Sequence, residues 1–214
     1  CRSLPRQRSF PTPKTTHWKR QSISEFMTPE LVDLFASFPS LSLTNAEHEL
    51  YRKLRCREPQ LISCSDNLSA NAGEEVFALS EKGQPLGVVS MVIQENQNKP
   101  TPKNNYVRLD LVIVDKKYRN LGVGRALIIC SLLEVLRNWE RKIYSISCLA
   151  GHKTVETYLQ ELSFQAHPRK EKDYWQGSLN LTDLDPHTLI KIYLKKAKIC
   201  LQWTSSQLHK KNSQ

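Results

Sequence analysis

Two glycines followed closely by an arginine form the part of this sequence best suited to chemistry. Gly122 and Gly124 come after an apolar, strand-like run that ends near Val114, and a helix-forming run begins directly after them. Glycine has no β-carbon, so an anion can approach its backbone closely. The first N–H groups of a helix have no partner inside it and can bind an anion. Because Arg125 adds a positive charge in the first turn, we expect this segment to hold a phosphate group.

Other readings of the glycine segment fit less well. No Gly-Lys-Ser/Thr sequence follows the glycines, which argues against a P-loop. A third glycine at the spacing of a dinucleotide-binding fold is missing. An ordinary tight turn between a strand and a helix stays open as an alternative, because a short glycine motif has little specificity by itself.

The segment resembles the acyl-CoA motif of the GCN5-related N-acetyltransferases, Arg/Gln-x-x-Gly-x-Gly/Ala. Arg119, Gly122 and Gly124 match its defined positions, and Tyr118 matches an aromatic residue often found before the arginine. The resemblance implies an enzyme that uses acetyl-CoA as co-substrate and transfers its acetyl group to an amine by direct attack. It also implies that the backbone of residues 119–125 binds the CoA pyrophosphate. The residues concerned are Arg119, Asn120, Leu121, Gly122, Val123, Gly124 and Arg125.

The resemblance assigns the pantetheine arm of CoA to the strand before the glycines. In the family this strand is bulged and diverges from its neighbour, and the arm pairs with backbone groups in the gap. The matching positions are Ile113 and Val114, with the acyl carbonyl near the N–H of Val112. A fully paired core strand is the alternative, because apolar side chains do not reveal which backbone groups are paired.

Asp110 is the candidate base, since it stands nine residues before Arg119, where the family often has an acidic residue or His. Alternation with Leu109 and Leu111 predicts its side chain on the opposite face of the strand. A partly dry cleft would raise the pKa of its carboxyl group towards the range useful for a base. A solvated carboxylate or a salt bridge with Arg108 are the alternatives.

Tyr158 and His152 are the candidate acids. The family often reprotonates the CoA thiolate with a Tyr, in a helical segment that reads roughly Asn-x-x-Ala-x-x-Phe-Tyr-x-x-x-Gly-Phe. Residues 152–164 match this segment in part, but Leu159 occupies the Tyr position and Tyr158 comes one residue earlier. One residue turns a side chain by ~100° around a helix, so core packing is an alternative role for Tyr158. His152 is expected to be an acid, a CoA contact or a structural group.

The elements predicted around these residues follow the order of the acetyltransferase fold. Capping residues open two helices, at Thr28-Pro29 and at Thr44. Period-two patterns predict strands, and a period of 3.6 predicts helices. The expected order is two helices, strands at 76–80 and 86–93, the strand and helix around the glycines, a strand at 143–149, a helix at 155–162, and strands at 163–168 and 188–195. A helix from Asp185-Pro186 is the alternative for the last strand.

This order is similar to the acetyltransferase fold over residues ~20 to ~196, and the resemblance implies an α/β fold with a mixed, mostly antiparallel sheet, flanking helices and splayed central strands. Both ends of the sequence are basic, because six of the 31 Lys and Arg lie in residues 1–24 and six more in 186–214, with no acid in either segment. We expect a basic arm over residues 1–20, an acetyltransferase domain over 21–196 and a basic tail over 197–214. Solvated ends are favoured over ends that bind nucleic acid or acidic membrane.

The six cysteines indicate a reducing compartment. None of them forms a Cys-x-x-Cys pair, which argues against a disulfide framework or a zinc site, so no metal is expected. Cys130 and Cys148 lie in apolar segments, as buried free thiols do. No apolar run approaches membrane-spanning length. We expect a cytoplasmic protein, or an organellar one if residues 1–20 are the remnant of a transit peptide.

Two functions from different classes fit these features. The first is acetyl transfer to an amine of a small molecule or a protein, a choice that the scaffold does not specify. The second is a catalytically weak acyl-CoA sensor or scaffold whose basic tails bind a partner. For either function we expect a monomer or a homodimer. Nucleic-acid binding is disfavoured, because the basic residues lack interleaved aromatic side chains.

Overall fold

The computed structural model describes residues 29–46, 50, 54, 73–95, 105–137, 143–150, 152–167, 175–182 and 184–213. Their strands form one seven-stranded sheet in the order β1-β2-β3-β4-β5-β7-β6. The strands are β1 (Leu41–Asn45), β2 (Gly73–Glu81), β3 (Gln84–Glu95), β4 (Asn105–Val114), β5 (Ile143–Ala150), β6 (Gln165–Ala166) and β7 (Trp175–Asn180). Only β4 and β5 pair in parallel among these strands. The mixed, mostly antiparallel sheet is therefore confirmed.

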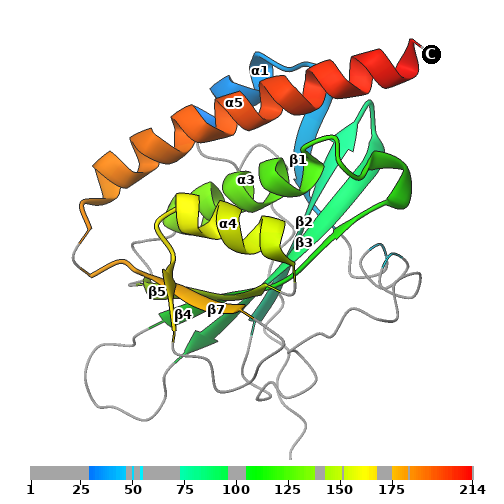
Figure 1. Ribbon diagram of the computed structural model, residues 1–214. Coiled ribbons are helices and arrows are strands. Elements are labelled where there is room, and N and C mark those ends of the chain that lie inside the picture. Colours follow the sequence, from blue (N-terminus) through cyan, green and yellow to red (C-terminus); the bar gives the residue numbers. More distant parts are fainter. Residues whose placement is uncertain are drawn as a thin grey trace, which may run out of the picture.

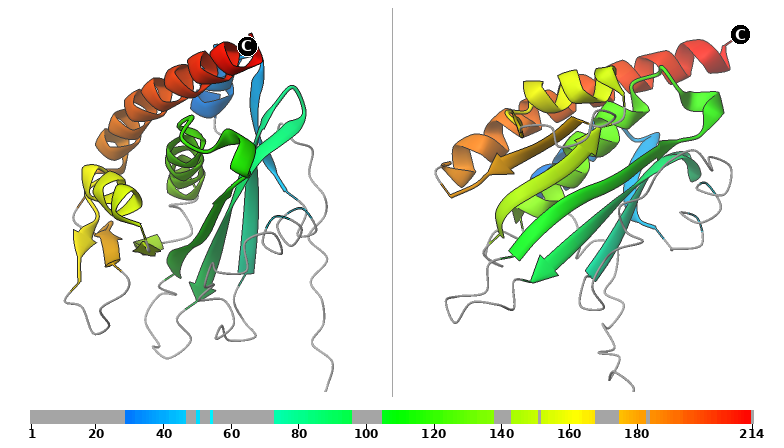
Figure 2. Two further views of the ribbon diagram at one scale, coloured as in Figure 1. Left: turned by 45° about the vertical axis from the view of Figure 1, so that its right-hand side comes forward. Right: turned by 60° about the horizontal axis from the view of Figure 1, so that its bottom comes forward.

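The helices α1 (Pro29–Ala36), α3 (Val123–Arg137), α4 (Lys153–Glu161) and α5 (Pro186–Asn212) lie on one face of this sheet, as Figures 1 and 2 show. The short 3-10 helix η3 (Lys116–Tyr118) follows β4. Buried residues of all four α-helices belong to one apolar cluster, to which each contributes side chains such as Leu31, Leu127, Leu159 and Leu201. A smaller cluster on the other face contains Val76, Val88 and Ile113. The sheet is thus buried between two apolar layers of unequal size.

The final strand predicted at 188–195 is wrong, because these residues belong to α5. Asp185 caps the helix by accepting hydrogen bonds from the N–H (3.0 Å) and the hydroxyl (2.6 Å) of Thr188, and Pro186 follows at the first helical position. Eight residues fitted a period of two by coincidence. Over a longer stretch, burial at Leu189, Tyr193 and Ala197 has the four-residue spacing of a helix.

The basic tail expected after residue 196 continues the same helix to Asn212. Ala197, Leu201 and Leu208 are buried in the large core cluster, and α5 packs along α3. The expectation of a solvated segment is therefore wrong for residues 197–212. The N-terminal arm expected over residues 1–20 lies outside the described residues.

The helix expected to open at Thr44 is also displaced. Thr44 and Asn45 belong to β1, a strand that the sequence pattern did not predict and that pairs antiparallel with β2. Leu41 and Leu43 are buried beside β2, so tertiary pairing overrides the local capping signal. Leu54 is helical, but most residues around it lie outside the described residues. The hairpin of β2 and β3, the helix after the glycines, β5 and α4 match their predicted positions.

Candidate active site

β4 contains a bulge at Asp110. Leu109 pairs with Met91 and Leu111 pairs with Ser90, so Asp110 is an extra residue with no counterpart in β3. A one-residue bulge exchanges the faces of the residues that follow it. Accordingly, Leu109 lies in the large cluster and Leu111 in the opposite one. The regular alternation predicted for residues 109–111 is therefore wrong.

β4 and β5 diverge immediately beside this bulge. Their parallel ladder ends at Leu109 and Cys148. β4 then continues to Val114 along β3 alone, while β5 continues to Ala150 along β7. Within the described residues, the edge of β4 from residue 110 to 114 therefore borders a separation between the strands. This confirms the splayed central strands that the resemblance implied, and Val112, Ile113 and Val114 lie on that edge.

The carboxylate of Asp110 is buried at the start of this separation. Its side chain is 0 % exposed, and its Oδ1 lies 3.6 Å from Nε of Arg108, whose side chain is 22 % exposed. The salt bridge left open by the sequence is therefore present. Asp110 is thus a buried carboxylate, paired with Arg108, at the point where β4 and β5 begin to diverge.

The glycine loop, residues 115–122, connects β4 to α3 through an irregular backbone. Asn120 has a φ of 64° and Gly122 a φ of 85°, a region that favours glycine. Asp115 stabilises the start of the loop, since its Oδ1 accepts the N–H of Lys117 at 3.0 Å. Nε of Arg119 donates to the carbonyl of Val114 at 3.3 Å. The loop therefore joins β4 to α3 through two left-handed positions, which are occupied by an asparagine and a glycine.

The N-terminus of α3 presents backbone donors next to this loop. The N–H of Ala126 bonds to the carbonyl of Gly122 at 3.0 Å. The preceding N–H groups, of Val123, Gly124 and Arg125, have no acceptor inside the helix. A β-carbon added at Gly124 would meet only the side chain of Val114, at an ordinary 3.5 Å. The structure thus places the seven predicted pyrophosphate residues in one continuous segment at the end of β4.

Tyr158 is buried where three helices meet. Its hydroxyl donates to the carbonyl of Arg125 at 3.2 Å and lies 3.4 Å from Sγ of Cys200. The guanidinium of Arg125 lies over its ring, 5.1 Å from the centroid. Burial raises the pKa of Tyr158, and the nearby Cys200 acts in the same direction. The hydroxyl therefore links α4 to α3 and α5 and keeps its proton.

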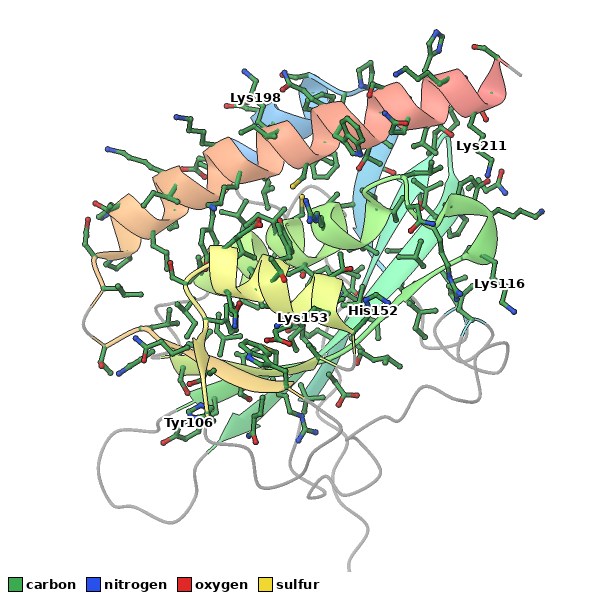
Figure 3. The ribbon with its side chains drawn as sticks, viewed as in Figure 1. Tyr106, Lys116, His152, Lys153, Lys198 and Lys211 are labelled. Carbon is green, nitrogen blue, oxygen red and sulfur yellow. The ribbon has the colours of Figure 1, made fainter. Side chains whose placement is uncertain are left out.

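His152 caps α4 at its N-terminus, where Figure 3 shows it. Its Nδ1 accepts the N–H of Thr154 at 3.3 Å, and the residue is exposed. Protonation of Nδ1 would break this cap. Only Nε2 is left to contact a ligand.

Two residues near the glycine loop were missed because they fell in the expected tail. A β-carbon at Gly122 would lie 2.7 Å from Cδ1 of Trp203 and 2.9 Å from Oγ1 of Thr204. The helical spacing that continues through Ala197 and Leu201 was the signal that could have placed them.

In the described part of the chain, no group of three or more His, Cys, Asp or Glu residues could hold a metal ion. No helix there has both the length and the apolar character needed to cross a bilayer.

The model of the acetyltransferase (GNAT) family matches residues 37–164, more than half of the chain. The match contains the bulged β4, the glycine loop and the starts of α3 and α4. The chain belongs to the GNAT acetyltransferase family. Acetyl transfer is the activity of this family and acetyl-CoA its co-substrate.

Several solved structures are similar to this GNAT chain. Arabidopsis thaliana NAA60 in complex with acetyl-CoA is 13 % identical, with 66 % of this chain and 99 % of that chain covered and a TM-score of 0.48. The ribosomal-protein-S18-alanine N-acetyltransferase from Escherichia coli is 15 % identical, with 68 % and 96 % covered and a TM-score of 0.48. A search of curated proteins found no match.

Proposed function

We propose that this GNAT protein transfers the acetyl group of acetyl-CoA to an amine by direct attack. One observation carries the proposal: the β4–β5 ladder ends at Leu109 and Cys148, and the same strand then leads into the glycine loop. A single stretch of backbone from residue 110 to 125 can therefore bind both the thioester arm and the pyrophosphate of one ligand. An acetyl group bound as a thioester would be activated for transfer.

The residues of this stretch fit acetyl-CoA. Backbone amides of residues 119–125 would bind the pyrophosphate, helped by the positive end of the α3 dipole. Because Gly124 has no β-carbon, the pyrophosphate could approach these amides closely. The edge of β4 at Ile113 and Val114 would pair with the pantetheine arm, and the N–H of Val112 would polarise the acyl carbonyl.

Asp110 is the proposed base. Amine attack requires loss of a proton, and the buried carboxylate lies where the two strands begin to separate. Its ion pair with Arg108 would hold the carboxylate in one position. We propose that it accepts the proton directly or through a water molecule.

Neither of the two candidate side chains is well suited to protonate the departing CoA thiolate. The Tyr158 hydroxyl donates to the Arg125 carbonyl, and burial raises its pKa. His152 would lose its cap bond if Nδ1 were protonated. These contacts favour solvent as the source of the proton. We propose that Tyr158 has a packing role, and that His152 caps α4 and contacts the ligand through Nε2.

Gly124→Asp tests the pyrophosphate assignment. A carboxylate beside the first amides of α3 would repel the pyrophosphate and should abolish CoA binding, measured by calorimetry. Gly83→Asp is the matched control, because Gly83 lies in the β2–β3 turn with no atom within 4 Å of an added β-carbon. Normal CoA affinity in a folded Gly124→Asp variant would contradict the assignment.

A panel of small amines and peptides, incubated with acetyl-CoA, tests turnover. Release of free CoA thiol that depends on the acceptor is expected for an acetyltransferase. CoA binding without thiol release from any acceptor would instead support the weak sensor or scaffold.

A further inference from the structure

The C-terminal half of α5 lies against the glycine loop, although some 80 residues separate them in sequence. In Figure 1 the helix runs over α3 and ends beside the tip of the β2–β3 hairpin and the β4–α3 connection. Two sets of contacts join these segments, one made by Trp203 and Thr204 and the other by Lys211. A third contact, made by Asn212, joins the end of α5 to the β2–β3 hairpin.

Trp203 and Thr204 occupy the space beside Gly122. A β-carbon added to Gly122 would lie 2.7 Å from the side chain of Trp203 and 2.9 Å from that of Thr204. Thr204 is 0 % exposed, whereas 57 % of Trp203 is exposed. An exposed indole and a buried threonine side chain therefore both border Gly122. The left-handed conformation of Gly122 is held between them.

Lys211 joins the end of α5 to the start of the same loop. Its ammonium group donates to the carbonyl of Lys117 and lies 4.8 Å from the centroid of the Tyr118 ring. Nδ2 of Asn212 contacts Oε2 of Glu81, in the β2–β3 hairpin, at 3.4 Å. Figure 3 shows Lys211 close to the hairpin tip, whereas Lys198 points away from the sheet on the outer face of α5.

The loop needs such support because its backbone is irregular. Asn120 and Gly122 both have positive φ, and neither helix nor sheet ladders order the residues between η3 and α3. Backbone amides bind an anion well only when they are already oriented towards it. Contacts that restrict the free loop should therefore strengthen binding without touching the ligand.

We propose that the C-terminal half of α5 positions the glycine loop, with Trp203 and Lys211 as positioning residues that set the affinity for acetyl-CoA. This inference rests on the proposed role of residues 119–125 as the pyrophosphate site. The residues act through the loop and have no part in the transfer of the acetyl group. Their loss should raise the KM for acetyl-CoA and leave kcat and the KM for the amine unchanged.

Lys211→Ala and Lys210→Ala form a matched pair. Both remove one positive charge from the end of α5, so we expect a similar loss of long-range attraction for CoA phosphates, but of the two only Lys211 has a contact with the loop. We expect Lys211→Ala to weaken CoA binding about fivefold by calorimetry, from the lost cation–π contact and hydrogen bond. Lys210→Ala should change it less than about twofold. Lys211→Arg, which keeps a donor and a cation over the ring, should restore most of the affinity.

Hydrogen exchange of the ligand-free protein supplies a second readout. In Lys211→Ala and Trp203→Ala, amides of residues 116–125 should exchange faster, while those of β5 and α4 stay as in the parent protein. Trp203→Phe keeps an aromatic ring over Gly122 and should keep the slower exchange. Both lysines are exposed, so the Lys211 comparison stays decisive even if Trp203→Ala fails to fold.

Equal CoA affinity and equal loop exchange in Lys211→Ala and Lys210→Ala would overturn the inference. Faster exchange spread over the whole sheet would also overturn it, since that pattern means general destabilisation. If Gly124→Asp binds CoA normally, the proposed pyrophosphate site fails and the affinity part of the inference fails with it. Loss of CoA binding in Gly124→Asp with no difference between the lysine variants would reject the inference alone.

Discussion

The side chain of Trp203 fills the space that a β-carbon on Gly122 would occupy. The approach would be 2.7 Å, well inside van der Waals contact. Gly122 also has a φ of 85°, which other residue types adopt at a cost. Glycine is therefore required at this position for two separate reasons, one local and one tertiary.

Gly122→Ala should destabilise the fold by about 2–4 kcal/mol, as backbone strain and the clash with α5 add together. Urea unfolding measures the change. Gly83→Ala is the control, since Gly83 has a φ of 80° but open space around an added β-carbon, so only strain applies. Equal losses in the two variants would show that Trp203 simply moves aside.

Leu201→Ala should lower the free energy of unfolding by about 2–5 kcal/mol, because Leu201 is 0 % exposed in the core between α5 and α3. Ile199→Ala should cost less than about 0.5 kcal/mol, since Ile199 is 58 % exposed on the same helix. Thermal or urea unfolding compares them. A small effect of Leu201→Ala would mean that α5 is not an integral part of the core.

Asp110→Asn should lower turnover on the order of a hundredfold and remove the acidic limb of the rate–pH profile, if Asp110 is the base. CoA affinity should stay unchanged, because the proposed pyrophosphate contacts begin nine residues later at Arg119. Steady-state rates across pH and calorimetry with CoA make the comparison. Normal rates at every pH would exclude the base role and leave positioning as the main source of catalysis.

Tyr158→Phe should cost about 1 kcal/mol of stability, from the lost hydrogen bond to Arg125, and change turnover little. Burial raises the pKa of Tyr158, so its hydroxyl stays protonated throughout a normal pH profile. The basic limb of that profile should therefore be the same in both proteins. A large fall in turnover with a shifted basic limb would restore Tyr158 as the acid.

Cys148 should resist alkylation in the folded protein. Burial raises the pKa of its thiol from 9.0 to about 12, so at pH 8 only about one molecule in ten thousand carries the reactive thiolate. Iodoacetamide labelling, followed by mass spectrometry of the Cys148 peptide, should be slow until urea is added. Rapid labelling of the folded protein at pH 8 would contradict this burial.

The same shift of the Cys148 pKa makes stability depend on pH. The folded protein holds the thiol proton more tightly than the unfolded chain does, so this contribution is complete below about pH 9. It should fall as pH rises from 9 towards 12, because only the unfolded chain then releases the proton readily. Unfolding of Cys148→Ala should lose this part of the pH dependence.

Local chemistry made the region from β4 to α3 predictable from sequence. The apolar run to Val114, the glycines at 122 and 124, and the helix-forming run after them depend on neighbours a few residues away. Backbone preference of glycine and the free donors of a helix start are properties of short segments. The family motif, the strand–loop–helix order and the position of the seven pyrophosphate candidates therefore follow from the amino-acid order alone.

Tertiary pairing decided the features that depend on distant residues. The bulge at Asp110 exists only in the register of Leu109 and Leu111 against Met91 and Ser90, so the alternation within β4 could not reveal it. The contact of Trp203 with Gly122 likewise requires α5 to pack along α3. Residues 188–195 alternate with a period of two, which suggested a strand. They form a helix instead, because this conformation buries Leu189 and Tyr193 against the rest of the core. Sequence alone determined the glycine loop of this acetyltransferase, and long-range packing determined where its candidate base lies and what supports the loop.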